Sequence, residues 1–130
     1  MCSARTRPQT ATPFVLLAGS VLLLSGCPRP SWSGTEAART HIASDNTSDR
    51  IRATAILGNS ITREPDEADL KRLIDRLEDT DAAVRLHAIT ALAQVAGGRM
   101  GYEAAAPLAE RHRAVRRWRS WFAARAEGGS

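Results

Sequence analysis

Cysteine and histidine are the side chains that most often act as nucleophiles or metal ligands, and this chain of 130 residues holds two cysteines and three histidines. The histidines, His41, His87 and His112, lie far apart, and none has the spacing of a HExxH zinc site. The sequence shows no set of residues that pairs a nucleophile with a base. We therefore expect no catalytic residues, no metal, no cofactor and no small-molecule substrate. The chain is predicted not to be an enzyme.

The first residues follow a three-part order that is typical of a secretory signal. Arg5 and Arg7 form a short positive head, and residues 14–24 form an apolar run, Phe-Val-Leu-Leu-Ala-Gly-Ser-Val-Leu-Leu-Leu. Such a run is too short for a membrane span, which needs about 20 apolar residues. The order of charge, apolar run and small residues instead predicts a segment that is removed on export.

The apolar run ends in leucine, two small residues and cysteine, which are Leu24, Ser25, Gly26 and Cys27. This tetrad resembles the bacterial lipobox. The resemblance implies that the Cys27 thiol takes a diacylglyceryl group and that the bond before it is cut, so that 1–26 is a lipoprotein signal peptide. The alternatives are an ordinary signal peptide, or a buried apolar helix with an unrelated cysteine. Position, spacing and composition together favour a lipoprotein anchored to a membrane of the bacterial cell envelope, inner or outer.

The cysteine count agrees with this prediction. Cys2 would leave with the signal peptide, and Cys27 would carry lipid, so the mature chain would have no thiol for a disulfide, a metal site or a nucleophile. Several acyl chains anchor a protein stably, because each buried methylene contributes about 0.8 kcal/mol. We expect the folded part to be held together by its apolar core alone.

The net charge of +4 is not evidence for nucleic-acid binding. Without Arg5 and Arg7, sixteen basic residues face fourteen acidic ones, and the mature chain carries only +2. The distribution is uneven, because 64–81 holds eight acidic residues against three basic ones, whereas 99–125 holds seven arginines against two acids. We expect an acidic middle, a basic end and no nucleic-acid partner.

Residues 28–47 are small and polar with little periodicity, and Pro28 and Pro30 oppose a helix directly after Cys27. Together with the lipidated Cys27 they are predicted to form a flexible tether, 27–47, that lifts the folded domain off the bilayer. A short helix over 36–42 is compatible with this segment. Trp32 either enters the membrane interface or is solvated.

From residue 48 onward the apolar spacing is helical. Leu70, Leu73, Ile74 and Leu77 share one face of a helix that begins near Asp66. A tight link then leads to a second helix, for which the Asp81 carboxylate is the predicted N-cap and Gly97 and Gly98 the stop. A further helix is expected from about Pro107 to 126, because proline suits a first helical turn. No segment shows strand alternation.

The two antiparallel helices suggest a repeated hairpin. Ile51-Arg52-x-x-Ala55-Ile56 matches Val84-Arg85-x-x-Ala88-Ile89 at a spacing of 33, and Ser48 then falls on the cap position of Asp81. The segment 77–92, Leu-Glu-Asp-Thr-Asp-Ala-Ala-Val-Arg-Leu-His-Ala-Ile-Thr-Ala-Leu, resembles a HEAT repeat of the phycobilisome-lyase type. The tail over 98–121 is similar to the closing segment of short bacterial HEAT-repeat proteins.

The resemblance implies an all-α fold for 48–126: a short HEAT-like array of helical hairpins with a C-terminal capping helix. In such repeats valine and alanine seal the hairpin, and the arginine reaches an aspartate of a neighbouring repeat. Carried over, Arg85 and Arg52 would pair with Asp79, Asp81 or Asp49 and set the repeat register, with Val84 and Ile51 at the sealing positions. Surface ion pairs of this kind contribute only about 0–1 kcal/mol each.

The segment 111–125 mixes arginines with aromatic residues. Val115, Trp118 and Phe122 share one face and are expected to cap the last hairpin, as the end of a solenoid requires. Trp121 lies off that stripe. The remaining surface forms a candidate interaction face of Arg113, Arg116, Arg117, Arg119 and Trp121.

The sequence therefore predicts a non-catalytic, lipid-anchored HEAT-repeat module of the bacterial cell envelope. Its partners would be the membrane, through lipidated Cys27, and an unidentified protein. The alternative is binding to an anionic membrane surface or a polyanion through the Arg/Trp-rich C-terminal helix.

Overall fold

The structure, a computed structural model, describes residues 31–129. Five helices follow one another in this range: α1 (Thr35–His41), α2 (Thr47–Ile61), α3 (Glu67–Arg76), α4 (Ala82–Ala96) and α5 (Leu108–Gly128). No strand occurs between residues 31 and 129, and the predicted all-α fold is confirmed. The predicted signal peptide, with Leu24, Ser25, Gly26 and Cys27, lies outside the described residues.

Local capping groups fix where α3 and α4 begin and end. The Asp66 side chain accepts a hydrogen bond from the Asp69 backbone N–H, and the Asp81 side chain accepts from the backbone N–H groups of Ala83 and Val84 in the first turn of α4. These carboxylates satisfy N–H groups that have no partner within a helix. Gly97 ends α4 with a φ of 78°, a left-handed conformation that glycine adopts without steric cost. The predicted starts near Asp66 and Asp81 and the stop at Gly97 are confirmed.

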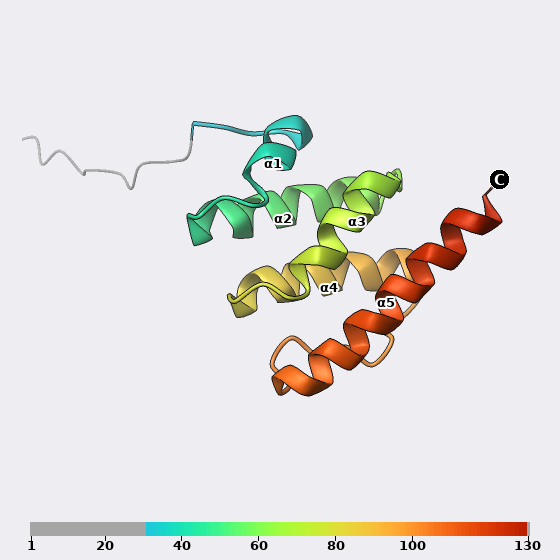
Figure 1. The fold of residues 1–130 in the computed structure, drawn as a ribbon. Coiled ribbons are helices and arrows are strands. Elements are labelled where there is room, and N and C mark those ends of the chain that lie inside the picture. The colour runs from blue at the N-terminus through green and yellow to red at the C-terminus, as the bar shows by residue number, and fades with distance from the viewer. Residues whose placement is uncertain (1–30, 130) are drawn as a thin grey trace, which may run out of the picture.

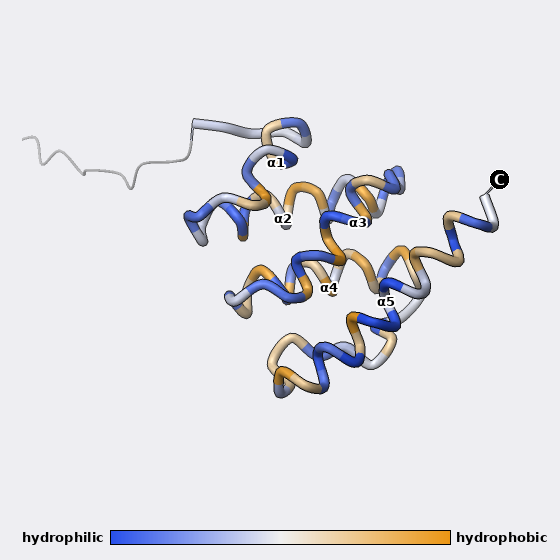
Figure 2. Tube along the Cα trace, viewed as in Figure 1, coloured by the Kyte–Doolittle hydropathy of each residue, from blue (hydrophilic) through white to orange (hydrophobic). Residues whose placement is uncertain are grey.

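The helices stack as two hairpins and a closing helix (Figure 1). α1 pairs with α2, α3 pairs with α4, and α2 lies beside α4 and runs in the same direction. α1 and α5 lie at opposite ends of this array. The apolar positions are concentrated between the helices (Figure 2), where the largest buried aliphatic side chains form one core. These are Leu57, Ile61, Leu70, Leu73, Ile74, Leu77, Ile89 and Leu92.

The flexible tether predicted for 27–47 is wrong for its second half. α1 occupies Thr35–His41, and Ala38 and Ile42 belong to the buried core. α1 agrees with the short helix that the sequence allowed over 36–42. Its burial is not predictable from the segment alone, because seven residues are too few to form a stable helix without tertiary contacts. Those contacts come from α2, which covers the apolar side of α1. The folded body therefore begins well before residue 48.

The two hairpin joints are built alike, at a spacing of 35 positions. In each joint an arginine Nη1 donates to two successive carbonyls. The backbone N–H of the N-cap residue donates to the side chain two positions earlier, and the N-cap side chain accepts a hydrogen bond from a backbone N–H of the first turn. The equivalent residues are Ser44 and Asp79, Asp45 and Thr80, Asn46 and Asp81, Ser48 and Ala83, and Arg50 and Arg85.

The predicted spacing of 33 is therefore wrong. Asn46 caps α2, not Ser48, and the arginine equivalent to Arg85 is Arg50, not Arg52. Ile51 is accordingly not equivalent to Val84. Val84 is fully buried, whereas Ile51 is only partly buried. The repeat register is set by hydrogen bonds to the backbone carbonyls of the joints and not by the residue types that the two helices share.

The segment 97–107 returns along the end of the second hairpin before α5 begins. Tyr102 is fully buried in this segment, and its hydroxyl donates to the Leu77 carbonyl at the C-terminus of α3. Trp118 of α5 is also fully buried, and its Nε1–H donates to the Arg99 carbonyl at 3.2 Å. Together they close the apolar end of the array.

We expect the free energy of unfolding to fall at alkaline pH because of Tyr102. Burial raises the pKa of its hydroxyl above the usual value of about 10. As the pH rises past that usual value, the tyrosine hydroxyl of the unfolded chain loses its proton before that of the folded chain. The contribution of Tyr102 to the free energy of unfolding therefore decreases as the pH rises towards the folded-state pKa. Tyr102 is the single tyrosine of the chain, so tyrosinate absorbance reports it alone.

The matched control is Tyr102→Phe, which keeps the ring and lacks the titrating hydroxyl. This variant should lose the alkaline component of the stability curve. An absorbance titration of the folded protein with an ordinary midpoint would contradict the prediction.

Candidate functional site

The α3–α4 joint centres on the Asp79 carboxylate. Arg50 donates to it through Nε at 3.0 Å and Nη2 at 3.2 Å, and Arg76 donates through Nη1 at 3.3 Å. The Asp81 backbone N–H donates to the same carboxylate at 2.9 Å. The Asp79 side chain is 3% exposed and that of Arg50 is 12% exposed. Asp79 therefore links the two hairpins through a largely buried ion pair, which sequence reasoning assigned to other arginines.

Arg85 makes no ion pair with any residue in the described range 31–129, contrary to prediction. Its guanidinium is buried and donates to three backbone carbonyls, those of Asp79, Thr80 and Ala104, at 2.7, 2.8 and 3.0 Å. Arg52 also differs from prediction, because its guanidinium lies over the Trp32 ring at 5.0 Å. Arg85 thus ties the joint to the 97–107 segment, which is a structural role.

A second buried carboxylate went unnoticed in the sequence. Asp69 of α3 is fully buried and accepts hydrogen bonds from Arg39 of α1, at 2.8 Å for the shortest, and from Arg72 at 3.0 Å. The hydrogen bonds from Arg39 to Asp69 are the main cause that raises the Arg39 pKa above its ordinary value. The pair joins α1 to α3, so both buried carboxylates hold the hairpins in register.

The predicted interaction face on α5 divides into two parts. Arg119 pairs with Glu78 at the end of α3, so its charge is compensated. Trp121 is partly buried, meets Trp118 edge-on at a centroid distance of 5.4 Å, and lies beneath Arg125 at 5.7 Å. Arg125 in turn pairs with Glu67 at 2.7 Å. These residues fasten α5 to α3.

The other three arginines form an exposed strip on α5, which we call the arginine strip: Arg113, Arg116 and Arg117. Their spacing of i, i+3 and i+4 places them together on the side of the helix opposite Val115 and Trp118. Arg117 donates to the Met100 carbonyl at 2.7 Å, and no acidic side chain pairs with any of the three within residues 31–129. Guanidinium groups that have no acidic partner can bind an anion. The strip matches the part of the predicted face that stays uncompensated.

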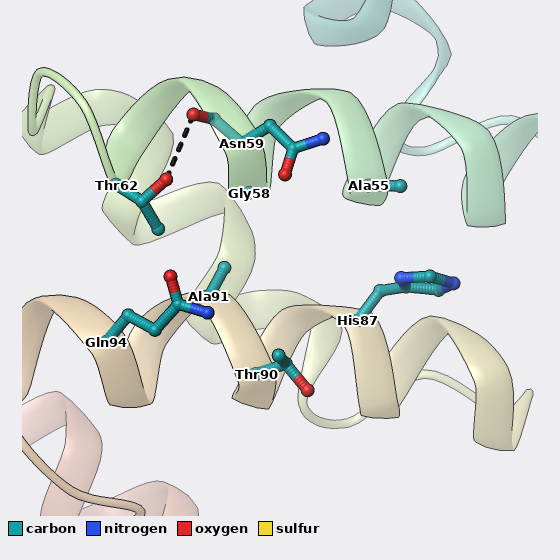
Figure 3. Close-up of a pocket in the computed structure, with 8 residues that line it drawn as sticks. All are labelled: Ala55, Gly58, Asn59, Thr62, His87, Thr90, Ala91 and Gln94. Atoms are coloured by element: carbon teal, nitrogen blue, oxygen red, sulfur yellow. Dashed lines mark hydrogen bonds between the residues drawn. The ribbon is translucent and has the colours of Figure 1, made fainter.

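A shallow groove of about 210 Å³ lies between α2 and α4 (Figure 3). No residue that lines it carries a carboxylate, an ammonium or a guanidinium group, so we call it the neutral groove. α2 and α4 approach each other closely at the floor of this groove, where a Cβ added to Gly58 would lie only 2.9 Å from the Ala91 Cβ. The lining residues are Ala55, Gly58, Asn59, Thr62, His87, Thr90, Ala91 and Gln94.

The neutral groove continues into the exposed side of α4, which also lacks charge. No exposed residue of α4 is an aspartate, glutamate, lysine or arginine, although these make up a quarter of the chain, and Leu86 exposes 48% of its surface. The exposed residues are Ala82, Ala83, Leu86, His87, Thr90 and Gln94. Amide and hydroxyl groups beside an exposed leucine can bind another polypeptide by hydrogen bonds and apolar contact. The sequence signal was the absence of charge at these positions, which sequence analysis did not use.

The histidines remain apart in the structure. His87 is exposed at the neutral groove, and His112 lies 3.8 Å from Glu78. His41 is stacked on Trp32. Within residues 31–129 no three or more histidine, cysteine and acidic side chains gather as metal ligands would. Along the same residues no helix has both the length and the apolar character needed to cross a bilayer.

Comparison of the chain with protein-family models, with curated proteins and with solved structures finds no match in any of the three. The resemblance to HEAT repeats and to the lipobox therefore stays a prediction from the residues themselves.

Proposed function

We propose that this chain is a non-catalytic, lipid-anchored interaction module of the bacterial cell envelope, which offers a helical surface to a protein partner. The observation that carries the proposal is the ordered run of positive head, apolar segment and Leu24-Ser25-Gly26-Cys27. Acyl chains on Cys27 would hold the helical body at a membrane, where it acts by binding.

The repeated joints support a short HEAT-like array. Two hairpins share a 35-residue spacing with the same set of hydrogen bonds, and stacked copies of one helical unit are what defines a solenoid. The 97–107 segment and α5 cover the last apolar face, as a terminal cap must. An array of this kind presents the exposed sides of its helices as a binding surface.

The uncharged side of α4 supports a protein as the partner. The central part of a protein interface is depleted in charged residues relative to the rest of the surface. The neutral groove and the exposed side of α4, with Leu86 at its edge, have this composition. The neighbouring surfaces of α3 and α5 carry ion pairs and arginines instead.

Cys27→Ser should abolish lipid attachment, because the thioether cannot form on a hydroxyl under the same modification. We expect the wild-type mature N-terminus to have the mass of an acylated cysteine, and the variant to lose both this mass and its recovery in the membrane fraction. Cys2→Ser is the matched control and should change neither. A wild-type mature chain that begins elsewhere, or carries no fatty acid, would overturn the proposal.

Capture from detergent-solubilised envelopes tests the binding role. Thr90→Arg introduces a charge into the neutral groove and should reduce recovery of the partner several-fold, because a buried, unpaired charge is costly. Thr40→Arg adds the same charge on the exposed side of α1 and should leave recovery unchanged. Equal recovery with both variants would exclude the α4 surface as the binding site.

A second candidate function is supported by the arginine strip. Three adjacent guanidinium groups without acidic partners suit an anionic surface. A soluble form starting at residue 28 would then bind anionic vesicles, with an affinity that falls steeply as salt is added. Arg116→Ala should weaken this binding, whereas Arg119→Ala should have less effect, since Arg119 is already paired with Glu78. Binding that is absent or indifferent to salt would remove this candidate.

A further inference from the structure

Trp32 is fixed on the folded body by residues from both helices of the first hairpin. Its ring is stacked on the His41 ring at a centroid distance of 4.4 Å, with an angle of 7° between the planes. The Arg52 guanidinium lies over the ring at 5.0 Å, and the indole Nε1–H donates to the Asp49 carboxylate at 3.2 Å. Trp32 also packs against the apolar core. We call this set of contacts the Trp32 clamp.

The clamp determines how much chain can separate the domain from a lipid on Cys27. A tether that ended at residue 47 would have a long reach, but the clamp fastens the chain at residue 32. Cys27 lies five positions earlier. A fully extended chain spans at most about 3.6 Å per residue, so the Cys27 sulfur cannot lie much more than about 18 Å from the clamp.

We infer that the anchored protein contacts the lipid bilayer through the α1–α2 joint, with the headgroup layer against the first hairpin. This inference rests on the proposed lipidation of Cys27. The length of chain before the clamp identifies the occupant of this surface, since the membrane that holds the acyl chains must lie within that reach. The exposed residues next to Trp32 and His41 in the sequence are small and uncharged, which is compatible with a hydrated headgroup layer: Ser31, Ser33, Thr40 and Ala43.

The orientation has a consequence for α5. α5 closes the end of the array opposite α1 (Figure 1). The arginine strip is exposed on the side of α5 that lies opposite the buried Val115 and Trp118. The strip therefore does not face the bilayer that holds the anchor. Any anion that it binds is presented from beyond the domain.

Two single-cysteine reporters test the orientation in the lipidated protein. The mature chain has no thiol besides the acylated Cys27, so Ala43→Cys and Ser120→Cys can each be labelled alone with a fluorophore. Ala43 is exposed in the α1–α2 joint, and Ser120 is exposed beside the arginine strip. The labelled proteins are inserted in vesicles of phosphatidylethanolamine and phosphatidylglycerol that contain a lipid with a nitroxide quencher on its headgroup.

We expect quenching to be several-fold stronger at Ala43→Cys than at Ser120→Cys. Adding Trp32→Ala should lower the quenching at Ala43→Cys, because the chain before residue 35 is then released, whereas Trp32→Phe should keep most of it. The mass of the N-terminus is measured on the same samples. An N-terminus without lipid would overturn the proposed function. A lipidated protein with equal quenching at both positions, or with stronger quenching at Ser120→Cys, would overturn the inferred orientation alone.

Discussion

Replacing Trp118 with alanine is expected to lower the free energy of unfolding by about 3–5 kcal/mol, the usual cost of removing a large aromatic side chain from a core. Trp118 is fully buried on the core side of α5, and its Nε1–H donates to the Arg99 carbonyl. Its loss would leave a cavity and an unpaired carbonyl at the end of the array. A domain of this size has a total stability of about 5–15 kcal/mol, so we expect much of the population to lose α5.

Equilibrium denaturation followed by far-UV circular dichroism measures this effect. Trp121→Ala is the matched control, since Trp121 lies on the same helix, is only partly buried and has no hydrogen bond to the 97–107 segment among those found in residues 31–129. It should cost clearly less than Trp118→Ala. If the two variants were equally stable, or both close to wild type, α5 would not be the cap that closes the core.

Much of the fold is predictable because its signals are local. The Asp81 carboxylate caps α4, Gly97 ends it, and α3 begins next to Asp66, all as predicted, because these residues act on helix ends only a few residues away. The apolar stripe of α3 is likewise a property of one segment. Such features need no knowledge of which helices meet.

The hairpin register was not predictable in the same way. The sequence offers the Ile51-Arg52 and Val84-Arg85 pairs at a spacing of 33, but it also contains Arg50 and Arg85, with Leu57 and Leu92, at 35. The second spacing is the structural one, because the joint carbonyls select which arginine they bind. The residue type alone does not determine which backbone carbonyls an arginine side chain will contact.

The candidate site depends even more on tertiary contacts. The neutral groove exists only because α2 and α4 lie side by side, and the close approach at Gly58 follows from that packing. The arginine strip was part of the predicted face, but which arginine of that face would pair depended on Glu78, which follows α3. Likewise, α1 is too short to give a clear helical pattern in the sequence, and it is stabilised by α2 and by the Trp32 clamp.

Asp79→Ala is expected to destabilise the domain by about 3–5 kcal/mol, the usual cost of removing one partner from a buried ion pair. The Asp79 carboxylate accepts from Arg50 and Arg76 and from the Asp81 backbone N–H, and its side chain is 3% exposed. Its removal leaves the Arg50 charge largely buried without its partner and frees the entry of α4. A surface ion pair, as the sequence predicted for Asp79, would contribute no more than about 1 kcal/mol.

Asp75→Ala provides the comparison, because Asp75 forms an exposed pair with Lys71 one turn earlier on the same helix. We expect this control to change the free energy of unfolding by about 0.5 kcal/mol or less. The double variant Arg50→Ala with Asp79→Ala should be less destabilised than the sum of the two single variants, since the uncompensated guanidinium is then absent. Additive effects, or an Asp79→Ala variant as stable as Asp75→Ala, would mean that this carboxylate does not hold the two hairpins together.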